Sequence, residues 1–257
     1  MFRTQMPRIY ELRDLIADPA SPDAYFQNFD ENVRKSPHHV NEIYLRREKE
    51  LRGLDPDSWK FLKSEASPYL VCKDPSGRGW QQLFDILNQA RAYNYLKTLG
   101  CSNIRFIPRA DKQALRTPDI EALLESDRVL CELKTINISQ KEIHVRTSFT
   151  VRSIGVRLDD GFFRKLHSDV IDAKNQMRAY DPLGTARHYV YINLCFDDSL
   201  AEYKERYFQQ IDQYLSGNPI QGVQLIFHND HTAFFTPLGM TNATAVNDGE
   251  EANGLGR

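Results

Sequence analysis

The sequence predicts an α/β fold, in which helices pack against a mixed β-sheet. From Trp80 onward, helical and strand-like patterns follow one another as helix, three strands, helix, strand, helix and strand. This mixing is typical of helices layered on a sheet. Hydrophobic residues make up 41% and charged residues 26% of the 257 residues, which is enough apolar material for a packed core. The length suits one large domain, or one domain with an appendage.

The first 75 residues predict a polar helical extension. Helical patterns cover three stretches, 9–18, 38–54 and 56–66. Pro56 suits the first turn of the third helix, because that position needs no backbone N–H and the proline ring fixes a helical φ. A loop over 73–80 leads into the main domain, which we place at 76–238.

In the main domain, apolar residues recur about every 3.6 residues in some segments, which predicts helices, and every second residue in others, which predicts strands. The expected elements are a helix over 80–100, strands over 103–108, 119–125 and 128–136, a helix over 160–180, a strand over 187–196, a helix over 198–215 and a hairpin over 222–238. The segment 142–158 is rich in β-branched residues and predicts a further hairpin. One apolar stripe marks the helix over 160–180: Phe163, Leu166, Val170, Ala173 and Met177. The polar, glycine-rich tail over 239–257 predicts disorder.

Charge and cysteine spacing exclude several classes of protein. The formal net charge is −2, so a surface that binds nucleic acid must be a local basic patch. The four cysteines form no C-x-x-C pair, which argues against a zinc knuckle and favours a reducing, cytoplasmic setting. The N-terminus lacks the apolar core of a signal peptide and no run reaches the length of a membrane span. We therefore expect a soluble protein with no membrane partner.

Two short charged motifs form the strongest candidate for a catalytic site. Pro118-Asp119 opens one expected strand, and Glu132-Leu133-Lys134 lies on the next. Side chains alternate along a strand, so Glu132 and Lys134 share one face, and a hairpin can bring Asp119 near Glu132. Two carboxylates and the Leu133 carbonyl offer the oxygen ligands that Mg²⁺ prefers. Both motifs recur elsewhere in the chain, so an exposed Glu–Lys pair beside a turn aspartate is the competing interpretation.

The arrangement resembles the PD-(D/E)xK nuclease superfamily, whose restriction-endonuclease-like core has the same order of helix, three strands, helix and strand. The resemblance implies that Asp119, Glu132 and the Leu133 carbonyl bind Mg²⁺ or Mn²⁺. It also implies that Lys134 orients the attacking water and stabilises developing negative charge. A bound Mg²⁺ lowers the pKa of its water and polarises the phosphoryl oxygen. On the first core helix, Gln89 stands where many members carry Glu; its amide oxygen can ligate a metal but adds no charge.

The segment from Gln176 to Tyr180 resembles the Gln-x-x-x-Tyr helix motif of the RecB-like branch of that superfamily. The resemblance implies that Gln176 contacts substrate phosphate or buttresses the site, and that Tyr180 on the same helix also contacts substrate. It requires the arginine-rich segment 140–158 to be an insertion. The likeness extends over residues 80–230.

Basic side chains follow Lys134 closely in the sequence and predict contacts to the phosphate backbone of a nucleic acid. Lysine and arginine neutralise phosphates, and most such contacts position the substrate rather than specify its sequence. The residues expected to contact substrate in this way are Arg146, Arg152, Arg157 and Lys165. A solvated hairpin with charged outer positions is the alternative.

The expected function is therefore an Mg²⁺- or Mn²⁺-dependent endonuclease acting on DNA, with RNA as the alternative substrate. The resemblance implies roles in restriction, repair or defence. A homodimer through the N-terminal helices is a hypothesis, because cutting both strands requires two sites. Gln89 keeps a second interpretation open, in which the same fold is a non-catalytic nucleic-acid-binding or protein-interaction module. His228 and His231 flank an expected Asn-Asp turn and favour a structural role.

Overall fold

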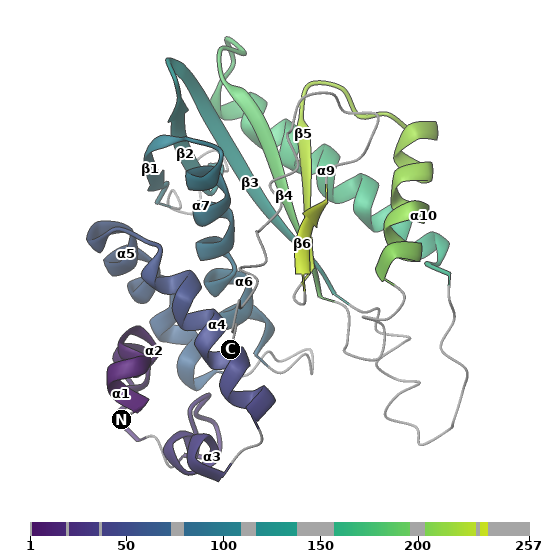
Figure 1. The fold of residues 1–257 in the computed structure, drawn as a ribbon. Helices are drawn as coiled ribbons and strands as arrows, with labels where there is room; N and C mark the ends of the chain where they lie inside the picture. The colour runs from purple at the N-terminus through teal and green to yellow at the C-terminus, as the bar shows by residue number, and fades with distance from the viewer. Residues whose placement is uncertain are drawn as a thin grey trace, which may run out of the picture. The chain divides into compact units, whose positions relative to one another are not determined.

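The computed structural model describes residues 2–18, 21–35, 38–72, 80–108, 117–137, 157–195, 204–229 and 232–235 (Figure 1). Contacts divide the chain into two compact units. The first comprises Met1–Pro108 and Asp119–Arg128, and the second comprises Arg109–Pro118 and Val129–Arg257. Most of the expected loop over 73–80 and hairpin over 142–158, and the whole tail over 239–257, lie outside the described residues.

The first unit begins with helices and ends with strands. Its elements are α1 (Phe2–Gln5), α2 (Pro7–Arg13), α3 (Phe29–Lys35), α4 (His38–Arg52), α5 (Pro56–Ala66), the 3₁₀ helix η1 (Ser67–Val71), α6 (Gln81–Leu87), α7 (Gln89–Thr98), β1 (Ser102–Phe106) and β2 (Ile120–Leu124). The three helices expected before residue 75 correspond to α2, α4 and α5. The single helix expected over 80–100 is instead two helices, which meet at Asn88. The contacts group α6, α7, β1 and β2 with the N-terminal helices, and the domain boundary expected near residue 75 stays a prediction.

A carboxylate from α4 caps the start of α2. Met6, at the N-cap position of α2, makes no capping side-chain hydrogen bond. Glu48 instead accepts hydrogen bonds from the backbone N–H of Ile9 at 2.9 Å and of Arg8 at 3.3 Å. These donors lack partners within the first turn of a helix. Glu48 is 2% exposed, and its ion pair with Arg52 at 2.8 Å offsets the burial of its charge.

Side chains from α7 hold the other end of α4. Asn94 Nδ2 donates to the Glu50 carbonyl at 2.8 Å, and Lys97 Nζ donates to the Gly53 carbonyl at 3.2 Å. The last carbonyls of a helix lack partners and carry partial negative charge, so amide and cationic donors stabilise them. Gly53 permits this contact, because a Cβ there would lie 1.9 Å from Asn94 Oδ1.

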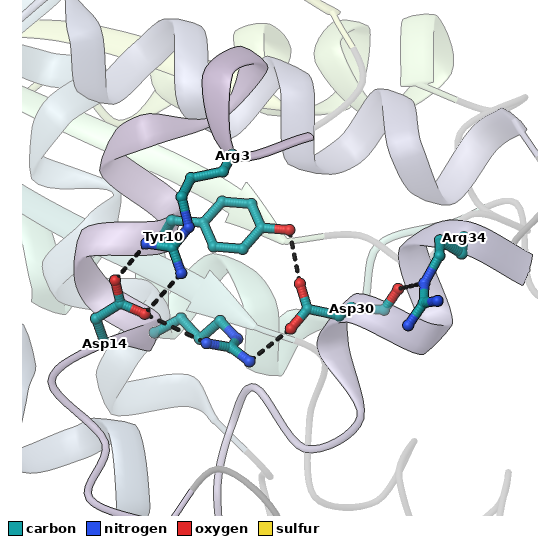
Figure 2. A network of polar contacts seen from close by, with 6 residues as sticks. Arg3, Tyr10, Asp14, Asp30 and Arg34 are labelled. Carbon is teal, nitrogen blue, oxygen red and sulfur yellow. Dashed lines mark hydrogen bonds and ion pairs between the residues drawn. The ribbon is translucent and has the colours of Figure 1, made fainter. Parts of the chain in front are cut away.

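A polar network joins α1, α2 and α3 (Figure 2). Arg3 donates to both oxygens of Asp14, at 2.6 and 3.2 Å, and the Tyr10 hydroxyl donates to Asp30 at 2.7 Å. Arg13 pairs with both carboxylates and so links the two halves of the network. Burial raises the pKa of Tyr10, and the hydrogen bond to Asp30 adds to this effect, so that the pKa reaches about 12.

Asp55 starts α5 and links it to α7. Its carboxylate accepts from the backbone N–H groups of Asp57 and Ser58, both at 2.9 Å, from the Ser58 hydroxyl at 2.6 Å and from the Tyr93 hydroxyl at 2.7 Å. Burial by itself would raise the pKa of Asp55. The four hydrogen bonds outweigh that effect and lower the pKa to about 2, because each of them favours the ionised form.

Strands β1 and β2 pair antiparallel in the first unit. Arg105 of β1 lies opposite Glu121 of β2, and both Arg105 and Arg128 form ion pairs with Glu121. Such opposite charges across neighbouring strands favour the observed register. Just before β2, the Asp119 carbonyl accepts from the Ile107 N–H at 2.9 Å, which fixes the entry of the chain into β2.

The second unit contains a mixed sheet. Its strands are β3 (Asp127–Asn137), which begins two residues before this unit, β4 (Arg187–Cys195), β5 (Gln224–Asn229) and β6 (Thr232–Phe235). The pairs β3–β4 and β4–β5 are parallel, and β5–β6 is antiparallel. Parallel neighbours need a crossover connection, and α9 (Asp160–Tyr180) and α10 (Lys204–Gly217) lie in these two connections. The predicted α/β class, with a mixed sheet flanked by helices, is thus confirmed.

The apolar stripe of α9 faces the core of the second unit. Leu166, Val170, Ala173 and Met177 are fully buried, and α9 contacts β4. Phe163, at the start of the stripe, stacks on Tyr214 of α10 with ring centroids 4.7 Å apart. The predicted stripe therefore exists, and its first member joins the two helices. None of the described helices combines the length and the apolar character needed to cross a membrane.

Candidate active site

Glu132 and Lys134 lie in the middle of β3, on the same side of the strand. In the parallel pairing with β4, Glu132 stands beside Val190 and Lys134 stands beside Ile192. Both of these β4 residues are fully buried, and Glu132 itself is 4% exposed. A carboxylate in such apolar surroundings loses its hydration and therefore needs partners within the protein.

Two side chains supply those partners. Lys134 Nζ donates to Glu132 Oε1 at 2.9 Å, and Gln176 Nε2 of α9 donates to Glu132 Oε2 at 2.6 Å. The same Gln176 nitrogen donates to the Thr117 carbonyl at 2.7 Å, which a side-chain amide can do because it carries two hydrogens. The structure thus brings together three of the residues expected from the sequence: Glu132, Lys134 and Gln176.

The pair is charge-balanced but not equally buried. The Lys134 side chain is 22% exposed and the Glu132 side chain 6% exposed. Removing one partner of a fully buried ion pair typically costs about 3–5 kcal/mol, and access of solvent to the lysine reduces this figure. The arrangement can therefore keep a carboxylate ionised beside an ammonium group, and that ammonium can stabilise negative charge that develops nearby.

Asp119 and Gln89 belong to the first unit. Asp119 is half-buried and directly precedes β2, while Gln89 is the first residue of α7 and is 7% exposed. The buried side chains of α7 are otherwise mainly apolar, with Arg91 as a second buried polar residue. The expected approach of Asp119 and Gln89 to Glu132 stays a prediction.

Leu133 and Tyr180 are both half-buried. Leu133 follows Glu132 on β3 and turns its side chain to the opposite face of the strand. Tyr180 is the last residue of α9, four positions after Gln176, and residues at that spacing lie above one another on one helix face. The metal-ligand role of the Leu133 carbonyl and the substrate contact of Tyr180 remain predictions.

The basic residues expected to hold substrate are described only in part. Arg157 is exposed just before α9, and Lys165 is exposed on α9 with an ion pair to Asp169 at 2.7 Å. Its charge is therefore already partly neutralised, which weakens it as a phosphate contact. Arg146 and Arg152 lie outside the described residues.

Two contacts were not anticipated from the sequence. The Thr117 carbonyl accepts a hydrogen bond from Gln176, and adjacency to Pro118 was its one sequence signal. On β4, Asn193 is 1% exposed and its Oδ1 lies 3.3 Å from His228 Nδ1 of β5; a polar residue within an apolar run was the signal there. His228 therefore joins two strands, and His231 lies beyond the described part of the chain.

The second unit offers oxygen ligands of the type that Mg²⁺ prefers, namely the Glu132 carboxylate and main-chain carbonyls. Lys134 and Gln176 already donate to Glu132, so a metal would use the lone pairs that remain on its oxygens. Within the described ranges, no three His, Cys, Asp or Glu side chains are grouped to hold a metal, but the expected ligand set has two carboxylates and needs no such group. Carboxylate and carbonyl oxygens are thus of the chemical kind that suits a hard divalent cation, and the metal site stays a prediction.

Comparisons with protein-family models, curated proteins and solved structures find no match.

Proposed function

We propose that the chain is a metal-dependent nuclease that hydrolyses phosphodiester bonds, with DNA as its substrate. The observation that carries the proposal is the Glu132 carboxylate, buried in a parallel strand with Lys134 Nζ at 2.9 Å and Gln176 Nε2 at 2.6 Å. A buried ion pair is a poor way to stabilise a strand, because desolvation offsets its attraction. A carboxylate beside an ammonium group is, however, well suited to a site that binds a divalent cation and a phosphate.

Each residue of the proposed site has a separate task. Asp119, Glu132 and the Leu133 carbonyl would hold Mg²⁺ or Mn²⁺, and Gln89 would offer a further oxygen. When bound, such an ion supplies a water of lowered pKa and a positive charge beside the phosphate. Lys134 would orient the attacking water and stabilise the negative charge that develops on the phosphate oxygens.

Gln176 is the positioning residue of this site. Its amide fixes one oxygen of Glu132 and is itself anchored on the Thr117 carbonyl. Asp119, the other carboxylate that we propose as a metal ligand, follows Thr117 by two residues.

The proposal includes a restriction-endonuclease-like core. Its support is the order of α7, β1, β2, β3, α9 and β4 along the chain, with β3 and β4 parallel. A cytoplasmic location, DNA as the partner, and a homodimer that cuts both strands of a duplex belong to the same proposal. RNA is the alternative substrate.

A second candidate is a non-catalytic nucleic-acid-binding or protein-interaction module. Two observations favour it. Gln89 is an amide at the position where an acid would add charge to a metal site. In addition, both oxygens of Glu132 already accept hydrogen bonds from side chains of the chain itself, which could satisfy the carboxylate without a metal.

Cleavage assays separate the two candidates. Supercoiled plasmid, linear single- and double-stranded DNA, and RNA are incubated with the full chain in Mg²⁺, Mn²⁺ or EDTA. We expect cleavage that needs the metal and falls about 100-fold or more in Glu132→Gln and Lys134→Ala. Glu11→Gln, which alters an exposed carboxylate on α2, is the control and should cleave normally.

Two results would count against hydrolysis at this site. Full-rate, metal-dependent cleavage by Glu132→Gln would place the chemistry elsewhere. Binding of nucleic acid without cleavage under any of the metal conditions would favour the non-catalytic module. Far-UV circular dichroism of every variant checks that a loss of activity does not come from a loss of fold.

A further inference from the structure

Lys134 and Gln176 hold the Glu132 carboxylate in different ways. Gln176 is neutral and is fixed at two acceptors, Glu132 Oε2 and the Thr117 carbonyl. Lys134 is charged, and its ammonium group donates a hydrogen bond to Glu132 Oε1 at 2.9 Å. The Lys134 side chain is also more exposed than that of Glu132. Lys134 and Gln176 therefore differ in charge.

We propose that Lys134 is a resident counterion of Glu132 which a divalent cation must displace, so that Lys134 restrains metal binding. This inference rests on the proposed function, because it concerns the same carboxylate as a metal ligand. A lysine ammonium group is a point charge on a flexible four-carbon stem, so it can leave the carboxylate. Gln176 stays in place and keeps Glu132 oriented.

The electrostatic reason is a competition between cations. Glu132 is buried among apolar side chains and needs a positive partner. Lys134 fills that need, and a divalent ion bound to the same carboxylate would lie close to a like charge, which disfavours binding. A neutral side chain at position 134 removes this repulsion and frees a lone pair on Oε1. The same change removes the ammonium group of Lys134 from beside the buried carboxylate.

The test measures binding of Mn²⁺ alone to the full chain, by electron paramagnetic resonance of the free ion, with no nucleic acid present. We expect Lys134→Met to bind Mn²⁺ on the order of tenfold more tightly than the unchanged chain, which is the effect of removing one partly exposed charge from a site. Lys134→Arg keeps the charge and should bind like the unchanged chain. Adding Glu132→Gln to Lys134→Met should abolish the gain.

Lys63→Met is the matched control. Lys63 forms an ion pair with Glu11 at 2.7 Å, and its side chain is 29% exposed, so it resembles Lys134 in pairing and exposure. It should leave Mn²⁺ affinity unchanged. As a second readout, Lys134→Met should melt at a lower temperature than the unchanged chain when no Mn²⁺ is present. Added Mn²⁺ should raise the melting temperature of Lys134→Met by more than that of the unchanged chain.

Equal or weaker Mn²⁺ binding by Lys134→Met overturns the inference, and so does an absence of binding by both proteins. Its failure can be told apart from failure of the proposed function. A chain that binds Mn²⁺ as expected but cuts no nucleic acid contradicts the nuclease proposal and leaves the competition intact. A chain that cuts nucleic acid while Lys134→Met shows no gain in affinity contradicts the competition alone.

Discussion

Replacing Gln176 with alanine removes a side chain that joins α9 both to β3 and to the segment before β2. The variant loses a hydrogen bond to the buried, charged Glu132 and a hydrogen bond to the Thr117 carbonyl. Hydrogen bonds to charged groups contribute about 1.5–3 kcal/mol and neutral ones about 0.5–1.5 kcal/mol. The better helix propensity of alanine returns a few tenths of a kcal/mol. We therefore expect Gln176→Ala to lower the free energy of unfolding by about 2–4 kcal/mol.

Urea unfolding followed by circular dichroism measures this loss. The neighbouring variant Asn175→Ala is the control, because Asn175 is exposed on the same helix and should change stability by about 0.5 kcal/mol or less. In thermal unfolding, a loss of about 3 kcal/mol corresponds to a Tm lower by roughly 6–12 °C for a chain of this size. If Gln176→Ala and Asn175→Ala have the same stability, then Gln176 does not anchor Glu132 as we describe.

Three further predictions concern the first unit. Asp55 has a lowered pKa of about 2, so the stability that its carboxylate contributes is complete above the unfolded-state pKa near 3.8 and is lost as the pH falls towards 2. Because the carboxylate is partly exposed, we expect this contribution to be about 1 kcal/mol. Between pH 4 and 2, Asp55→Ala should therefore lose less stability than the unchanged chain. Glu48→Ala removes the acceptor for the first turn of α2 and should cost about 2–3 kcal/mol in urea unfolding; a change below about 0.5 kcal/mol would contradict the capping role. Gly53→Ala places a Cβ against Asn94 and should cost about 1–3 kcal/mol, and a double-mutant cycle with Asn94→Ala should recover part of the loss if that clash is its cause.

The helix bounds that the sequence predicted best are those set by a strong local pattern. The pattern of α9 repeats an apolar residue every three or four positions, and its expected range of 160–180 agrees with the structure. The break between α6 and α7 was missed, since the apolar period runs through it without a glycine or proline. At that break, the Asn88 side chain accepts a hydrogen bond from Arg47 of α4. A contact that spans 41 residues leaves no mark in a local pattern.

In the candidate site, too, local patterns predicted contacts between residues close in sequence but not those between distant ones. Strand alternation predicted that Glu132 and Lys134 share a face, and their 2.9 Å contact agrees. The Gln176–Glu132 contact joins residues 44 positions apart, so periodicity could not predict it, and the motif resemblance was the one pointer to it. No motif marks the Thr117 carbonyl, since any residue can supply a main-chain acceptor.

The central claim is that Glu132 belongs to a divalent metal site. The most direct measurement is a crystal structure of the full chain grown with Mn²⁺, with diffraction data that locate manganese by its anomalous scattering. Our account predicts a peak about 2 Å from a Glu132 oxygen, with an Asp119 oxygen also bound and Lys134 moved away from Oε1. Saturating Mn²⁺ with no peak at Glu132, and the Lys134–Glu132 pair intact, would contradict it.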